Sequence, residues 1–207
     1  YPEIENFYGR DKGDFVLEQE KDGGRYRWCS LEPRRLSSGF VNPPDCADAL
    51  DQHRHALELA PYMLSLSPLD CEALDLLFGL DFTYAGNQHQ LVSEVLGVCP
   101  ALERIAGMPG AVLTNNEPTL TVALDDDCRI QCRVGVETRT NAYQIRTGEF
   151  AEEQLSVYVT ARQYGSLDPG TTYVAAMDNL AQVADDVIEH YVAETVLEPL
   201  ARAISLG

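Results

Sequence analysis

Five arginines and a tyrosine in the second half of the chain have the spacing that would gather them on one face of an antiparallel sheet. Apolar and polar side chains alternate in residues 128–137 and 155–162, which is the period-two pattern of strands with one buried face. The polar side of these strands and of the segment between them carries Arg129, Arg133, Arg139, Arg146, Arg162 and Tyr158. Clustered guanidinium groups bind carboxylates or phosphates through paired N–H donors. We therefore expect these six residues to bind an acidic protein segment or a small anion.

The same arginines have a second interpretation, in which they pair with carboxylates of the protein itself. Glu137, Asp75 and Asp81 are acidic residues that neighbouring strands could bring next to them. Cross-strand ion pairs on a wet surface contribute little stability and leave no charge for a ligand. The register of residues 72–84 against the other strands decides between the two interpretations.

Catalytic and zinc-binding motifs are not found in the sequence. It contains no GxSxG, Walker A or GxGxxG motif. His53 and His55 lie near Cys46, but they are two apart on an expected helix and point in different directions, so they cannot share a zinc ion. We expect no metal and no cofactor. Whether the protein is an enzyme stays open, and a non-enzymatic function is favoured.

Two other histidines lie at helix positions where ligands can bind. His89 follows Asn87 at a strand-to-helix junction, where a helix N-terminus could hold an anion. A capping turn with a solvent-exposed histidine is the alternative. His190 shares a helix face with Asp186 and Glu194, but no second helix offers matching metal ligands.

The composition limits which partners the chain can have. Among 207 residues, 33 are acidic and 15 basic, which gives a net charge of −18, and 45% are hydrophobic. This is a globular composition with an acidic bias, which excludes a fully disordered chain. Without a basic cluster, general binding to nucleic acid or to anionic membranes is disfavoured. No apolar run approaches the roughly 18 residues that span a bilayer, so we expect a soluble protein.

The six cysteines indicate the redox environment. They contain no CxxC pair, and a chain of 207 residues can build a core without disulfides. Cys128 and Cys132 are four apart in an expected strand, too far for a bridge. Free, mostly buried thiols in the cytoplasm are the expectation.

The first 45 residues are rich in glycine, proline and charge, and they predict an N-terminal arm. Alternating residues 15–20 and 25–29 flank a glycine-containing turn at residues 21–24, which predicts a β-hairpin. Loops are expected at residues 37–39 and 42–44. We place the domain boundary between this arm, residues 1–45, and a single α+β domain, residues 46–207.

The remainder predicts helices on either side of a sheet-forming region. Asp45 caps a helix that extends to about Leu59, with Pro61 ending or kinking it. Residues 72–84 alternate as a strand, and Asn87 caps a short helix. Antiparallel strands follow in residues 113–164, including a shorter one at residues 143–145. Residues from about 171 to 204 predict a helix roughly 45 Å long with a kink at Pro199.

The predicted fold class is α+β, with a curved antiparallel sheet of about five to seven strands and helices on one face, including the long C-terminal helix. In the order of its elements, the chain resembles both the helix-grip ligand-binding fold and the acidic dimeric secretion-chaperone fold. Neither resemblance rests on a sequence motif.

Three functional hypotheses follow. The first is a non-enzymatic binding or adaptor protein that uses the polar, Arg-bearing sheet face. The alternative is a small-molecule or enzymatic pocket between the sheet and the long helix, with Tyr143 and Tyr191 as its polar groups. The third is a homodimer, built through the acidic surface and the part of the long helix that overhangs the sheet.

Overall fold

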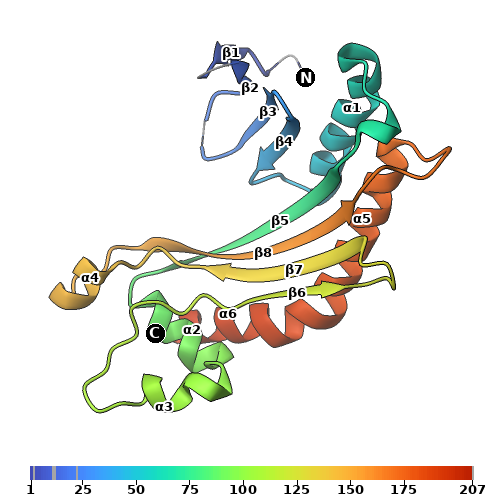
Figure 1. The fold of residues 1–207 in the computed structure, drawn as a ribbon. Coiled ribbons are helices and arrows are strands. Elements are labelled where there is room, and N and C mark those ends of the chain that lie inside the picture. Colours follow the sequence, from blue (N-terminus) through green and yellow to red (C-terminus); the bar gives the residue numbers. More distant parts are fainter. Residues whose placement is uncertain (2, 11–12, 22, 207) are drawn as a thin grey trace. The chain divides into compact units, whose positions relative to one another are not determined.

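The computed structural model describes residues 1, 3–10, 13–21 and 23–206. The chain forms two compact units, and each contains a four-stranded antiparallel sheet (Figure 1). The first unit comprises residues 1–70 and 167–174, and the second comprises residues 71–166 and 175–207. The α+β class is confirmed, but the expectation of one sheet of about five to seven strands is corrected to two sheets of four. The boundary expected at residue 45 stays a prediction, because compactness does not measure independent folding.

The sheet of the first unit has the order β1-β2-β3-β4. Its strands are β1 (Asn6–Gly9), β2 (Phe15–Glu18), β3 (Tyr26–Glu32) and β4 (Arg35–Val41). Strands β2 and β3 form the predicted hairpin; Asp22, in the predicted turn, lies outside the described residues. The loop expected at residues 37–39 is instead part of β4. Gly39 faces Trp28 there, and the indole ring fills the space that a Cβ at Gly39 would need.

Helix α1 (Cys46–Leu64) packs against β4. As predicted, Asp45 caps it, and the carboxylate accepts a hydrogen bond from the Ala47 N–H at 2.9 Å. The helix does not end near residue 59 but continues through Pro61, which lies in its last turn. A proline there removes one intrahelical hydrogen bond, and the short remainder of the helix tolerates the loss.

The sheet of the second unit has the order β5-β8-β7-β6. Its strands are β5 (Ala73–Tyr84), β6 (Thr119–Ala123), β7 (Ile130–Glu137) and β8 (Glu153–Tyr164). The strand predicted at residues 72–84 is confirmed. The strand expected at residues 143–145 is wrong, because helix α4 (Ala142–Thr147) occupies this segment. Asn141 and Gln144 form a capping box that starts this helix.

The predicted C-terminal helix is present as one uninterrupted run. It comprises α5 (Tyr173–Val187), the π-helical segment η4 (Ile188–Leu197) and α6 (Glu198–Leu206). Figure 1 shows the run turning between α5 and α6. The N–H of Glu198 bonds to the carbonyl of Ala193, five residues back, and Pro199 has no N–H to restore the α-helical pattern. The expected kink at Pro199 therefore lies in the π-helical segment before it.

The shorter helices are α2 (Gln88–Leu96), α3 (Glu103–Ala106), and the 3-10 turns η2 (Pro68–Asp70) and η3 (Pro100–Leu102). None of the helices in the described ranges has the length and hydrophobicity that crossing a membrane requires.

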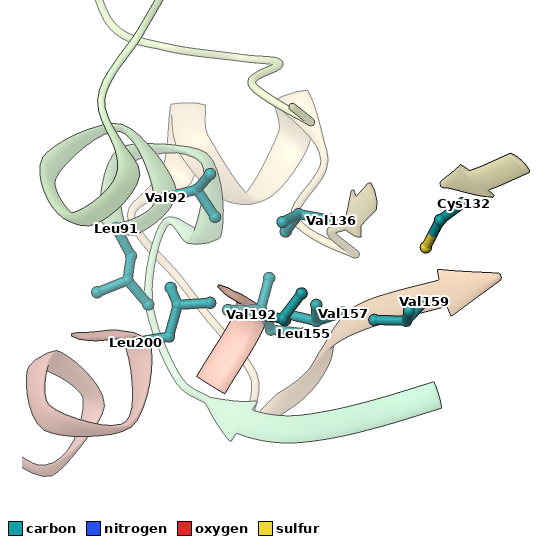
Figure 2. Packing of buried hydrophobic residues seen from close by; sticks show 9 residues of the cluster. All are labelled: Leu91, Val92, Cys132, Val136, Leu155, Val157, Val159, Val192 and Leu200. Atoms are coloured by element: carbon teal, nitrogen blue, oxygen red, sulfur yellow. The ribbon is translucent and has the colours of Figure 1, made fainter. Parts of the chain in front are cut away.

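The core of the second unit lies on one face of its sheet, where α2, η4 and α6 pack. Figure 2 shows side chains of α2 and of the C-terminal helix facing those of β7 and β8. The cluster comprises Leu91, Val92, Cys132, Val136, Leu155, Val157, Val159, Val192 and Leu200. The three β8 members expose no surface, and burial of such a side chain stabilises the fold by about 1.5–3 kcal/mol. The expectation of helices on one face is confirmed.

Candidate binding face on the second sheet

The other face of the second sheet turns away from this core, and we call it the outer face. Along β5, the residues of the outer face are exposed, whereas those between them are half-buried or buried. Within the second unit, alternation of this kind indicates that β5 is packed on its core side alone. The outer face is formed by residues 73, 75, 77, 79, 81 and 83 of β5, 154, 156, 158, 160, 162 and 164 of β8, 131, 133, 135 and 137 of β7, and 119, 121 and 123 of β6.

Arg162 is engaged by a carboxylate of the protein. It lies opposite Asp75 on β5, and its Nε and Nη2 atoms donate to the two carboxylate oxygens. Its Nη1 also donates to the hydroxyl of Tyr164 at 3.1 Å. The hydrogen bonds to Asp75 and Tyr164 raise the pKa of Arg162 further above its already high value. For this arginine, the interpretation as a cross-strand ion pair is confirmed.

Arg129 and Arg139 flank β7 rather than project from it. Arg129 donates to the carbonyls of Tyr164 and Ser166, at 3.3 and 2.7 Å, and so joins the start of β7 to the end of β8. Arg139 follows the last residue of β7, and its Nη1 lies 3.3 Å from the carboxylate of Glu137. Arg129 therefore holds two strand ends together, whereas Arg139 pairs with a carboxylate at the end of its own strand.

Arg146 lies outside the sheet altogether. It belongs to α4, and its guanidinium lies over the ring of Tyr143, 5.4 Å from the centroid. The structure therefore does not bring the five predicted arginines together on one face, because Arg129 and Arg139 lie beyond the ends of β7 and the segment that contains Arg146 is a helix rather than part of the sheet.

Arg133 lies on the outer face of the sheet, and its charge is open to a ligand. It is an exposed residue of β7, opposite Thr160 on β8 and Thr121 on β6. No residue in the described ranges forms a hydrogen bond or ion pair with its guanidinium. A planar guanidinium with five free donors suits a carboxylate of another molecule.

Tyr158 is placed on the same face by glycines on both neighbouring strands. Its cross-strand partners are Gly79 on β5 and Gly135 on β7. A Cβ at Gly79 would lie 3.1 Å from Cε1 of the tyrosine, so the ring covers the backbone of this glycine. A longer side chain at position 79 would have to displace the ring. Tyr158 is thereby supported while its side chain stays partly exposed.

Leu77 is a member of this surface that the sequence analysis did not single out. It lies opposite Thr160 and is 56% exposed. An apolar residue at a polar position of an alternating strand would have indicated it. Leu77 and Arg133 thus flank Thr160 across the strands, and Tyr158 and Arg162 flank it along β8. We call these five residues the Thr160 surface.

The helix N-terminus at His89, considered for anion binding, is occupied by the protein itself. The side chain of Asn87 accepts from the N–H groups of His89 and Gln90 at 3.1 and 3.2 Å. The imidazole of His89 is buried, its Nδ1 accepting from the N–H of Asn116 and its Nε2 lying 3.1 Å from the carbonyl of Thr140. The alternative of a solvent-exposed histidine is therefore wrong, although the capping turn is confirmed.

The neighbours of His89 extend this polar network. Glu117 accepts two hydrogen bonds from Thr138, one from the N–H and one from the hydroxyl, both at 2.8 Å. Partial burial opposes ionisation, but these bonds hold the pKa of Glu117 below its usual value. The buried Gln88 accepts from the N–H of Arg139 and donates to the carbonyl of Glu153. The network ties α2 to the ends of β7 and β8, which is a structural role.

One serine and one histidine are close enough for acid–base chemistry. Oγ of Ser38 lies 2.6 Å from Nδ1 of His53. Burial, together with the charge of Arg27, lowers the pKa of His53. In the described part of the chain, no carboxylate orients this imidazole as a catalytic triad would require. The contact joins α1 to β4.

Metal ligands are not grouped in the described residues, where no set of three or more His, Cys, Asp or Glu side chains could hold an ion. The six cysteines are free thiols. Three of them, Cys46, Cys99 and Cys128, are exposed, contrary to the expectation of mostly buried thiols.

The space between the sheet and the C-terminal helix is filled by the core cluster. Hollows of about 340 and 330 Å³ lie elsewhere, one beside α2 and α3 and one on β1, β2 and β3. Tyr143 and Tyr191, expected as polar groups of an internal pocket, are 60% and 67% exposed. The described residues thus give no support to the pocket hypothesis.

Comparison with known proteins adds no functional information, because no family model, no curated protein and no solved structure matches the chain.

Proposed function

We propose that the chain is a non-enzymatic binding protein that recognises an acidic segment of a protein partner through the Thr160 surface. The observation that supports the proposal is the position of Arg133, an exposed guanidinium between two threonines on the outer face, for which the described residues supply no partner. A carboxylate of the partner pairs with the Arg133 guanidinium, which no carboxylate of the described residues does.

The neighbours of Arg133 favour a protein over a small anion. Arginine, tyrosine and large apolar residues dominate the energetics of protein interfaces. Leu77, Tyr158 and Arg133 lie on the three consecutive strands β5, β8 and β7, and Tyr158 is two residues from the partner that Leu77 and Arg133 share. The Thr160 surface offers a flat apolar and aromatic area beside one charge. A small anion would be better held by several converging donors, and Arg162 is already engaged by Asp75.

A peptide selection tests this proposal. A random dodecapeptide library is selected on the immobilised chain and, in parallel, on the Arg133→Glu variant. We expect peptides rich in Asp and Glu, with an apolar residue nearby, to be enriched on the parent chain and on the control variant Arg146→Glu, but not on Arg133→Glu. Arg146→Glu is the matched control, because it makes the same charge change on α4, outside the surface. Enrichment of the same peptides on all three proteins would contradict the proposal.

Inorganic phosphate distinguishes the small-anion hypothesis. If the Thr160 surface recognises proteins, phosphate leaves the thermal unfolding midpoint of the parent chain and of Arg133→Glu equally unchanged. A phosphate-dependent rise that requires Arg133 would replace the protein partner with a small anion.

A further inference from the structure

Strand β5 leaves one edge of the second sheet unpaired. The strand has 12 residues and pairs along one side with β8 over its whole length. In the described residues, no other strand pairs with its second side. Such an edge presents a row of N–H and C=O groups to any strand that approaches it.

The opposite edge of the same sheet is protected, whereas β5 is not. Strand β6 has only five residues, directly after Pro118, and the acidic turn at residues 125–127 follows it. Short length, proline and charge are the features that keep sheet edges from pairing. Strand β5 is long, contains no proline or lysine, and its Asp75 is neutralised by Arg162.

The core-facing side chains of β5 are left incompletely covered. Five of its six large apolar residues on that face are only half-buried, and Leu76 alone is fully buried. Leu80, Phe82 and Tyr84 pack against the core cluster with one flank still accessible. A further strand beside β5 would extend the sheet and cover that flank.

The sequence of β5 is complementary to itself. An antiparallel pairing of β5 with its own copy can use nearly the full strand only when it is centred on Phe78 or on Gly79. Centring on Phe78 sets Asp75 against Asp81 at two symmetric positions, which is repulsive. Centring on Gly79 sets Asp81 against Leu77 and Asp75 against Thr83, and it pairs only apolar residues on the core-facing side.

We propose that two copies of this chain associate through their β5 strands, antiparallel and centred on Gly79, to form one continuous eight-stranded sheet. The interface is isologous, as in most homodimers. It uses the strand edge and does not require an acidic partner at Arg133, although Leu77 belongs both to this interface and to the Thr160 surface.

Charge substitutions at Leu77 test both the dimer and its register. Leu77 is exposed, so variants there keep the fold, which circular dichroism verifies. In the Gly79-centred dimer, Leu77→Glu faces Asp81 of the other copy at two symmetric positions, and Leu77→Lys offers it an opposite charge. Sedimentation equilibrium of the full chain should show a dimer. We expect Leu77→Glu to raise its dissociation constant about tenfold and Leu77→Lys to leave that constant unchanged or lower it.

Two further variants complete the test. Adding Asp81→Lys to Leu77→Glu replaces each like-charge pair by an opposite-charge pair and should restore the dimer. Thr121→Glu on β6 makes the same charge change at the protected edge and should leave the association unchanged. A parent chain that stays monomeric at every concentration would overturn the proposal, as would a dimer insensitive to Leu77→Glu. Equal weakening by Leu77→Glu and Leu77→Lys would overturn the Gly79 register.

Discussion

Arg162 on β8 and Asp75 on β5 lie directly opposite one another and form a two-pronged ion pair across the strands. This pair neutralises one of the two arginines that the sheet itself places on the outer face. Arg133 lies opposite Thr160, two residues before Arg162 on β8, and no carboxylate in the described residues pairs with it. The difference between the two arginines comes from register alone.

Releasing Arg162 should strengthen binding of an acidic peptide. In Asp75→Asn, the guanidinium loses its carboxylate and becomes a second site for the ligand beside Arg133. We expect an affinity for the selected peptide several-fold higher than that of the parent chain, measured by fluorescence anisotropy. Stability should fall by less than about 1 kcal/mol, because both side chains of the pair are substantially exposed.

The control for this experiment is Asp81→Asn, which removes a carboxylate from the same strand and face without freeing an arginine. If both variants bind the peptide with the affinity of the parent chain, Arg162 takes no part in the surface.

The sequence was sufficient to predict elements that local patterns determine. The strand at residues 72–84, the caps Asp45 and Asn87, and the C-terminal helix all have a periodicity or capping residue that acts within a few positions. The error at residues 143–145 was avoidable, because Asn141 and Gln144 have the spacing of a capping box.

The candidate site was less predictable, because its chemistry depends on long-range pairing. Asp75 and Arg162 are 87 residues apart, and no local pattern indicates that they lie opposite each other. The division into two sheets was not predicted for the same reason. Alternation identifies strands and their faces, but not which strands are neighbours.

Gly39→Ala should destabilise the first unit. A Cβ at this position overlaps the ring of Trp28, so either the ring or strand β4 must move. We expect a loss of about 1–3 kcal/mol, the range for overpacked sites. Trp28 is the single tryptophan, so its fluorescence in urea reports on this unit. Ser37→Ala in the same strand is the control, and equal midpoints for the two variants would contradict the packing of Trp28 against Gly39.

Acidification should weaken the first unit through His53. Burial and the charge of Arg27 lower the pKa of this histidine in the fold, whereas the unfolded chain has the ordinary value of about 6.5. Below that value the unfolded state takes up a proton on His53 that the folded state excludes. The contribution of His53 to stability is therefore present above about pH 6.5 and is lost as the pH falls.

The measurement is the urea midpoint of Trp28 fluorescence at neutral and at mildly acidic pH, for the parent chain and for His53→Gln. The parent should lose more stability on acidification than the variant, since the two proteins differ only at residue 53. The same loss in the two proteins would show that His53 is not the responsible group.

The dissociation constant of the selected acidic peptide, compared between the parent chain, Arg133→Glu and Arg146→Glu, tests the binding surface most directly. A hydrogen bond to a charged group contributes about 1.5–3 kcal/mol, so Arg133→Glu should weaken binding at least tenfold. Arg146→Glu, with the same net charge, should bind like the parent chain. Equal affinities for Arg133→Glu and the parent chain would contradict the account of the Thr160 surface as a binding site.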